Sequence, residues 1–155
     1  MPRQKRDVPH EEINKFVLVF PSLSVNEGAA RAAAGAFIAQ MDPTAGELAD
    51  LKCAISEAVT NCIVHAYRDR LGRIRMTVHL YRDRSVLIEI KDNGSGIADV
   101  EKAREPLFTT DADGERSGMG FTVMETLTDR LTVISSPGRG TTVKLLNRLN
   151  ERGRR

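Results

Sequence analysis

The sequence predicts an α+β fold, a two-layer α/β sandwich in which helices cover one face of a mixed, mostly antiparallel β-sheet. Helical and strand patterns follow one another in the order β-α-α-β-β-α-α-β-β, and the helices are amphipathic on one side only. The strands expected over residues 74–81 and 85–91 are joined by the short turn Arg82-Asp83-Arg84, which makes them an antiparallel hairpin. A parallel doubly wound sheet is excluded, because its neighbouring strands need a crossover helix between them.

Each element follows from a local pattern. Strands are expected where β-branched and aromatic residues alternate or cluster between turn residues. They are residues 13–20, 74–81, 85–91, 131–135 and 142–146. Helices are expected where apolar residues recur at helical spacing. They begin at the capping-box pattern of Ser24 and Glu27, after Asp42-Pro43-Thr44, at Ala98 and near Gly118, and the first three end near Met41, Tyr67 and Ala103.

Length and charge favour one globular domain. The chain has 155 residues and a formal net charge of +2, so no strong field points to a direct nucleic-acid partner. The expected domain spans residues 13–147, between a basic N-terminal extension (1–12) and a basic C-terminal tail (148–155).

Localisation is predicted from hydropathy and cysteine usage. No run of about 18 apolar residues predicts a membrane span, and no apolar stretch follows the charged N-terminus as in a signal peptide. Cys53 and Cys62 are the two cysteines of the chain and lie in one predicted helix. This favours reduced thiols and a cytoplasmic location.

Three short segments, far apart in the sequence, together predict a nucleotide site. In residues 56–61, Glu57 and Asn61 stand one helical turn apart on the same helix face. Residues 92–97 and 116–121 are glycine-rich turns, where backbone amides approach phosphates closely because no Cβ intervenes. A carboxylate, a carboxamide able to bind Mg²⁺ and two phosphate-binding loops are components of phosphoryl-transfer sites.

The first two segments also have ordinary structural explanations. Taken alone, Glu57 is a solvated helix glutamate and Asp92-Asn93-Gly94 is a simple turn. As site residues, Glu57 positions or deprotonates an attacking hydroxyl, and Asn61, a poor helix former, binds Mg²⁺. Asp92 accepts a hydrogen bond from the exocyclic amine of adenine, and Gly96 lets the ring lie close.

The third segment is expected to bind the phosphates. Gly118 and Gly120 open a helix whose N-terminal amides suit phosphate oxygens, although such a pair of glycines is weak evidence alone. Arg116 is placed to reach a terminal phosphate. Thr141 is either a strand former or a hydroxyl near the base.

These motifs resemble the GHKL ATP-binding group, which includes gyrase, histidine kinases and MutL. In more detail, the chain is similar to the anti-sigma F family of spore-forming bacteria. The segments that carry this similarity are residues 26–31, 37–40, 42–44, 56–61, 106–110 and 115–121. It covers about residues 15–146 and departs before Ile13, at Ala66, where the family often has glycine, and in the C-terminal tail.

The resemblance implies an anti-sigma factor that inhibits a sporulation sigma factor and uses Mg²⁺ and ATP to phosphorylate an anti-anti-sigma antagonist on serine. It also implies a homodimer. Glu57 is the implied catalytic base, Asn61 the Mg²⁺ ligand, and Arg31 and Glu27 the partner contacts. The implied nucleotide contacts are Asn61, Asp92, Gly94, Gly96, Thr109, Thr110, Arg116, Ser117, Gly118, Gly120 and Thr141.

Two alternatives stay open. A stress-response anti-sigma kinase shares these motifs and differs in its sigma factor, and an ATP-gated sigma-binding module uses the site without kinase activity. The catalytic domain of a histidine kinase is disfavoured, because it needs a dimerising helical hairpin with a phosphoacceptor histidine, which this short chain lacks.

Overall fold

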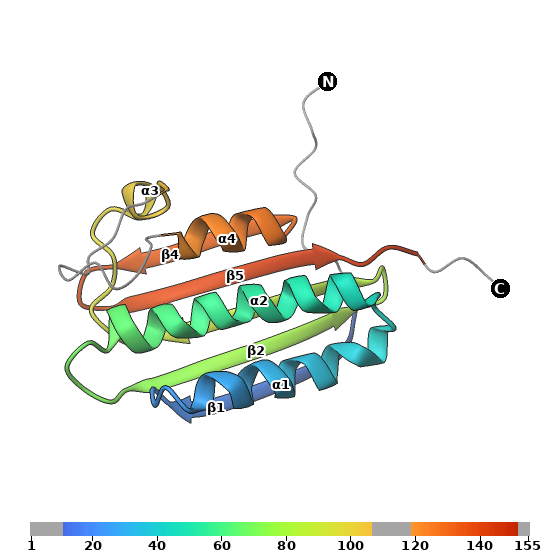
Figure 1. The fold of residues 1–155 in the computed structure, drawn as a ribbon, viewed down its shortest axis with the longest axis horizontal. Helices are drawn as coiled ribbons and strands as arrows, with labels where there is room; N and C mark the ends of the chain where they lie inside the picture. Colours follow the sequence, from blue (N-terminus) through green and yellow to red (C-terminus); the bar gives the residue numbers. More distant parts are fainter. Residues whose placement is uncertain (1–10, 107–118, 152–155) are drawn as a thin grey trace, which may run out of the picture.

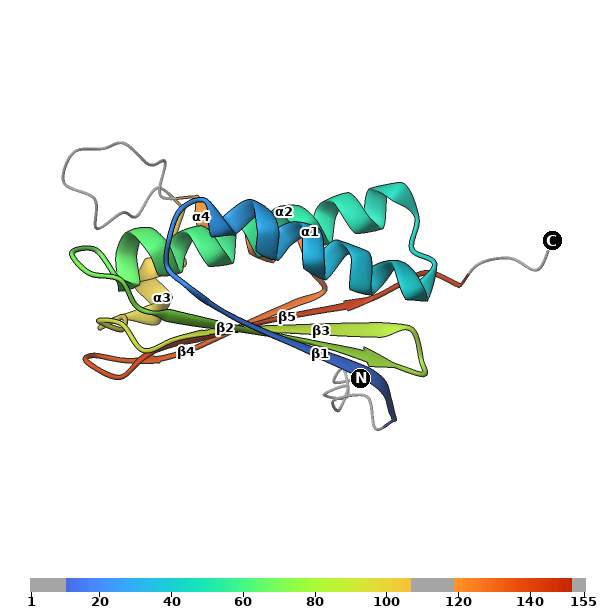
Figure 2. The same cartoon turned by 90° about the horizontal axis from the view of Figure 1, so that it is seen from below.

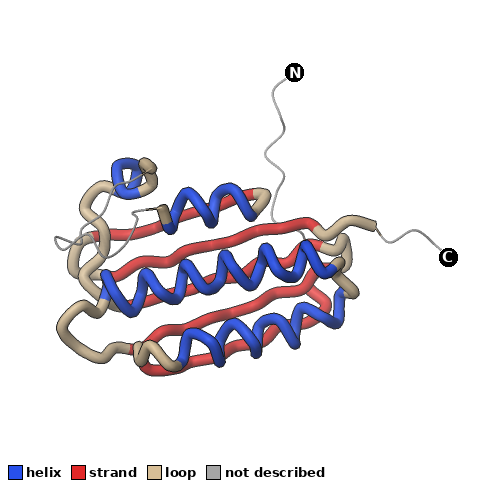
Figure 3. Tube along the Cα trace, in the orientation of Figure 1, coloured by secondary structure: helices blue, strands red, loops and turns tan. Residues whose placement is uncertain are grey.

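The computed structural model describes residues 11–106 and 119–151. Within them, five strands form one sheet in the order β1-β2-β3-β5-β4, and each pairing is antiparallel. The strands are β1 (Glu12–Pro21), β2 (Arg73–Tyr81), β3 (Ser85–Asp92), β4 (Arg130–Ser136) and β5 (Gly140–Arg148). The helices are α1 (Asn26–Ile38), α2 (Ala45–Asn61), α3 (Val100–Ala103) and α4 (Gly120–Leu127), with a 3₁₀ turn η1 (Ala39–Met41) and a π turn η2 (Cys62–Ala66). Figure 3 shows the helices and strands coloured by type.

The two-layer sandwich is confirmed. Helices α1, α2 and α4 lie side by side over one face of the sheet, and the opposite face carries none of the described helices (Figures 1 and 2). Fully buried aliphatic side chains of α2, such as Leu51, Ile55 and Val59, belong to the same core as Ile74 and Ile88 of the sheet. Removing such a side chain from water stabilises the fold by about 1.5–3 kcal/mol.

The register of the sheet brings together the ends of two strands that are distant in sequence. Asp92, at the end of β3, pairs with Ile74 on one side and with Thr141 of β5 on the other. Gly140, which begins β5, pairs with Ser136, which ends β4. The edge of the sheet reached by Asp92 is therefore also the edge where the β4–β5 turn lies.

The expected capping box at Ser24 is wrong. Helix α1 follows Val25 as its N-cap, with no side-chain capping hydrogen bond. The Glu27 carboxylate accepts hydrogen bonds from Arg31 and Ser56 instead, so a contact with α2 takes the place of the cap. A complete capping box stands at the start of α2, where Thr44 Oγ1 accepts from the Glu47 amide at 3.0 Å. The Glu47 carboxylate accepts from the Thr44 amide at 2.9 Å.

The second helix changes character near its end. The sequence predicts a helix to about Tyr67, whereas the α-helical part ends at Asn61 and continues as the π turn η2. The hydrogen bond from the Tyr67 amide to the Cys62 carbonyl, 3.1 Å long, closes this wider turn. Single π turns inside helices occur frequently at functional sites.

Candidate nucleotide-binding site

Glu57 and Asn61 share one face of α2, as their spacing predicts. Both side chains are partly buried, and both lie against Gly120, the first residue of α4. A Cβ on Gly120 would lie 3.3 Å from Asn61 Oδ1 and 3.4 Å from Glu57 Oε2. The structure thus brings a carboxylate, a carboxamide and the start of a helix together from two distant segments.

The donor set at this place fits a magnesium ion. The Asn61 carboxamide oxygen is a hard ligand of the kind that Mg²⁺ takes, with substrate phosphates and water completing its shell. In the described residues no three His, Cys, Asp or Glu side chains gather to bind a metal by themselves. Asn61 would therefore hold Mg²⁺ together with the phosphates of a nucleotide.

Asp92 is buried where β3 ends, and its carboxylate is held by the protein. Oδ1 accepts hydrogen bonds from the amides of Gly94, at 2.9 Å, and Thr141, at 3.2 Å. The Cys62 thiol donates to Oδ2 at 3.4 Å. Burial raises the pKa of Asp92, and the three hydrogen bonds oppose this by favouring the charged form. Burial, and then the nearby Asp92 charge, raise the pKa of the Cys62 thiol well above its usual range.

The glycines after Asp92 are explained by contacts within the protein. A Cβ on Gly94 would come within 2.3 Å of the Ala66 carbonyl oxygen. Gly96 has a φ of +73°, and its Cβ would meet the Ser136 carbonyl oxygen at 2.0 Å. Both positions therefore exclude a side chain whether or not a ligand is bound, and their contact with a nucleotide stays a prediction.

Thr141 lies in a small hydroxyl network beside Asp92. Its Oγ1 is 2.7 Å from Ser135 Oγ, which also donates to the Gly140 carbonyl at 3.0 Å. The same Ser135 oxygen accepts from the Ile97 amide at 2.8 Å. This network fixes the loop after Asp92 against the β4–β5 turn.

Cys62, Tyr67 and Ser135 also contribute contacts at this site, although they are not among the residues predicted for it. The Tyr67 hydroxyl accepts from the Asn93 amide at 2.6 Å and donates to the Arg73 carbonyl at 2.8 Å. Burial raises the pKa of this phenol. For Cys62 the sequence offers one signal, which is its position directly after Asn61. The contacts of Tyr67 and Ser135 cross between elements and leave no local pattern.

Five predicted nucleotide contacts cannot be placed. Thr109, Thr110, Arg116, Ser117 and Gly118 lie outside the described residues. Their roles therefore stay predictions.

The predicted partner contacts lie on α1 and connect to α2. Arg31 forms an ion pair with Glu27 Oε1 at 3.0 Å, one helical turn apart. Ser56 Oγ donates to the same carboxylate oxygen. Ser56 precedes Glu57, so the proposed partner surface is joined by hydrogen bonds to the helix that carries the proposed base.

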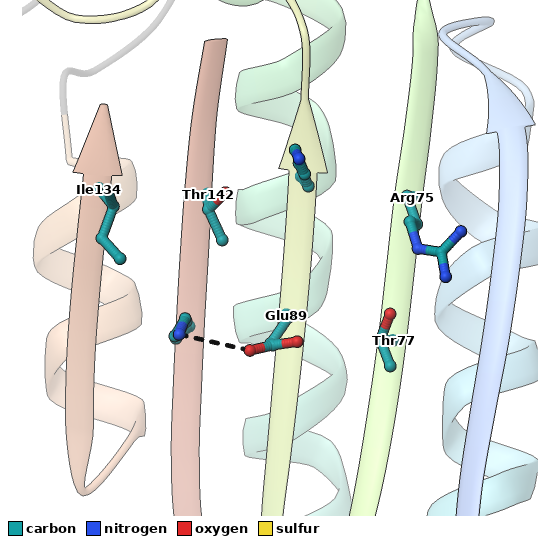
Figure 4. A pocket seen from close by; sticks show the side chains of 7 residues that line it. Arg75, Thr77, Glu89, Ile134 and Thr142 are labelled. Carbon is teal, nitrogen blue, oxygen red and sulfur yellow. Dashed lines mark ion pairs between the residues drawn. The ribbon is translucent and has the colours of Figure 1, made fainter. Parts of the chain in front are cut away.

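A shallow hollow of about 260 Å³ lies on the helix-free face of the sheet, opposite the nucleotide residues (Figure 4). Its lining residues come from β2, β3, β4 and β5, and Lys144 pairs with Glu89 across it at 3.5 Å. Lys91 lines it, whereas the adjacent Asp92 points to the other face, as alternation along a strand requires. The hollow is thus not part of the nucleotide site.

Two glycines of the β4–β5 turn give a matched test of the packing at Asp92. Gly138 and Gly140 have φ of +75° and +88°, but a Cβ on Gly138 meets nothing within 4 Å, whereas one on Gly140 lies 2.1 Å from the Asp92 carbonyl oxygen. We expect Gly138→Ala to lower the free energy of unfolding by about 1 kcal/mol, from backbone strain alone. Gly140→Ala should cost about 2–5 kcal/mol, because overpacking adds to the strain. Equal losses in urea denaturation would contradict this placement.

No helix in the described part of the chain has the length and apolar character required to cross a bilayer.

Comparison with known proteins gives consistent matches over most of the chain. Residues 20–146 match the family model of the histidine kinase-like ATPase domain. The anti-sigma F factor of Caldanaerobacter subterraneus is 53% identical over 132 residues, which cover 85% of this chain and 92% of that protein. The anti-sigma F factor of Bacillus subtilis is 48% identical over 139 residues, covering 89% of this chain and 94% of that protein.

Solved structures share the fold. A crystal structure of the RsbU and RsbW domains of a Mycobacterium tuberculosis protein has a TM-score of 0.68 at 21% identity, covering 91% of this chain and 34% of that chain. The histidine kinase domain of a blue-light activated kinase from Erythrobacter litoralis has a TM-score of 0.54 at 20% identity, covering 79% and 61%. At these identities the likeness concerns the fold. The family match and the close relatives go further: the chain belongs to the histidine kinase-like ATPase domain family, whose fold binds ATP, and within it to the anti-sigma F factors.

Proposed function

We propose that this protein inhibits a sporulation sigma factor by binding it and that it phosphorylates an anti-anti-sigma antagonist on serine, using Mg²⁺ and ATP. The observation that carries the proposal is the meeting of Glu57, Asn61 and Gly120 beside the nucleotide segments, in a chain about half identical to anti-sigma F factors. A cytoplasmic location is part of the proposal.

The proposed chemistry assigns one role to each group. Asp92 accepts a hydrogen bond from the amine of adenine, and Asn61 contributes an oxygen to Mg²⁺, which neutralises phosphate charge when bound. The Glu57 carboxylate accepts the proton of the substrate serine hydroxyl as its oxygen attacks the γ-phosphorus and ADP leaves. The amides at the start of α4, from Gly120 on, favour the phosphates because helix N-termini carry partial positive charge.

Partner binding is proposed for the exposed side of α1. The Arg31 side chain is 41% exposed and its guanidinium is oriented by Glu27, which supports a role in contacting a protein surface. Because Glu27 is also bonded to Ser56, ordering of α2 by a nucleotide would be transmitted to α1 through one carboxylate.

The test is incubation with labelled ATP, Mg²⁺ and a candidate anti-anti-sigma protein, followed by mapping of the phosphorylated residue. Phosphoserine on the partner supports the kinase. ATP-dependent sigma binding with no phosphorylated partner supports the alternative of an ATP-gated binding module. Preferential binding of a general-stress sigma factor supports the stress-response alternative, whereas the relatives' names favour the sporulation factor.

We also propose that the protein forms a homodimer and that the helix-free face of the sheet is the dimer interface. Val19 of β1 and Ile134 of β4 are 44% and 56% exposed there, at the two ends of one row of cross-strand neighbours that includes Arg75, Lys91 and Thr142. In a two-fold symmetric interface each residue occurs twice, once from each subunit. A charge introduced at either end of this row is therefore buried twice in the dimer.

We expect the double variant Val19→Glu and Ile134→Glu to sediment as a monomer at concentrations where the parent is a dimer. Leu71→Glu, which changes an exposed apolar residue in the turn before β2, is the matched control and should remain dimeric. A double variant that dimerises like the parent would exclude this face, and a monomeric parent would refute the homodimer.

A further inference from the structure

The two oxygens of the Asp92 carboxylate have different surroundings. Oδ1 accepts two backbone amides, from Gly94 and Thr141. Oδ2 has one described protein donor, the thiol of Cys62 at 3.4 Å. A carboxylate oxygen has about two acceptor positions, so Oδ1 is saturated while Oδ2 has capacity for one further donor.

Cys62 and Asp92 are both buried, each with only 3% of its surface exposed. A free cysteine in a core usually behaves as a small apolar residue. Here its sulfur instead contacts a buried ionisable group, and such a group needs donors if its charged form is to persist. The thiol is a weak donor, so it can orient Oδ2 without competing strongly with a ligand for that oxygen.

Cys62 reaches Asp92 from the C-terminal end of the helix that carries Glu57, the proposed base, and Asn61, the proposed Mg²⁺ ligand. It is the first residue of the π turn η2 and directly follows Asn61. The same residue therefore links the α2 face, where phosphate chemistry is proposed, to the end of β3, where base recognition is proposed.

We infer that Cys62 is a positioning residue for adenine recognition. Its thiol holds the plane of the Asp92 carboxylate so that Oδ2 faces the exocyclic amine of the base. This inference rests on the proposed nucleotide-binding function and adds a specificity determinant to it. The ligand class is a 6-amino purine nucleotide, distinguished from a 6-oxo purine, which presents an acceptor at the same place.

The experiment compares ATP with inosine triphosphate, which has an oxo group in place of the 6-amine and therefore also a proton on the neighbouring N1. Dissociation constants for both are measured by calorimetry for the parent, Cys62→Ala, Cys62→Val and Cys62→Ser. Alanine and valine both remove the thiol donor, and valine also fills the space of the thiol. Either variant is sufficient for the test, provided that it folds. Cys53→Ala, on an exposed face of the same helix, is the matched control.

Loss of the donor should lower the ratio of ATP affinity to inosine triphosphate affinity about two- to tenfold, the range for one hydrogen bond. Serine should restore most of the ratio, and Cys53→Ala should leave it unchanged. A merely structural role would weaken both nucleotides equally, and an unchanged ratio in the donor-less variants would overturn the inference. If the parent binds neither nucleotide, the proposed function itself fails, which the parent's own titration reveals separately.

Discussion

Replacing Glu57 with glutamine is expected to reduce serine phosphorylation of the partner by about 10²–10⁴-fold, the usual contribution of a general base. Glutamine keeps the size of the side chain but cannot accept the serine proton. ATP affinity should change little, because the nucleotide is bound through other residues. Single-turnover phosphorylation with saturating ATP, together with calorimetric ATP binding, measures the two effects separately.

The matched control is Asp50→Asn, which removes a carboxylate from an exposed position of the same helix. It should phosphorylate at the parent rate. If Glu57→Gln also retains the parent rate, then Glu57 is not the base. If the Glu57→Gln variant loses ATP binding in parallel with activity, the role of Glu57 is structural. Its carboxylate would then serve to pack α2 against the start of α4, since it lies 3.4 Å from the position of a Cβ on Gly120.

The second large effect is expected at Asp92. Asp92→Asn replaces a charged acceptor with an amide that presents a donor to one of its neighbours, and a hydrogen bond to a charged group contributes about 1.5–3 kcal/mol. We therefore expect ATP affinity to fall about 10- to 100-fold, measured by calorimetry at neutral pH. Asp69→Asn, an exposed change in the turn after η2, should leave the affinity unaltered.

The same residue predicts a pH dependence. Burial raises the pKa of Asp92 in the free protein above that of an ordinary aspartate. Its contribution to stability is therefore complete below the unfolded-state pKa and is lost as the pH rises through the folded pKa. Adenine binding favours the charged form, so ATP affinity should decrease as the pH falls through this raised pKa. ATP affinity of the Asp92→Asn variant should not show this decrease. If the ATP affinities of the parent and the variant fell equally as the pH is lowered, the prediction would be contradicted.

Local patterns in the sequence were sufficient for most of the fold. Alternation in residues 74–81 and 85–91 predicted the central hairpin, and the structure confirms it as β2 and β3. The apolar stripe of α2 predicted which side of that helix is buried, because helical periodicity decides which residues share a face. For the same reason, Glu57 and Asn61 were expected on one face, and they lie together against Gly120.

Other features depended on contacts between distant elements. Two segments carry the capping-box pattern, and Thr44 with Glu47 forms one, whereas Glu27 bonds to Ser56 on a neighbouring helix. No local rule distinguishes them, since a carboxylate binds whichever donor the tertiary fold brings within reach. The glycines at 94 and 96 were expected to let a nucleotide approach closely, and this stays a prediction, because the groups that approach them in the structure are carbonyls of Ala66 and Ser136.

By itself, then, the sequence determined the strand and helix pattern, the shared face of Glu57 and Asn61 and the family resemblance, because each depends on residues that are close along the chain or on motif spacing. Only the tertiary structure decided that Asp92 is buried against the Cys62 thiol and the Thr141 amide. It also decided that Gly120 meets the face of α2 that carries Glu57 and Asn61. These contacts join segments 30 or more residues apart, and their energies arise from burial and hydrogen bonding that exist only after the sheet and helices have packed.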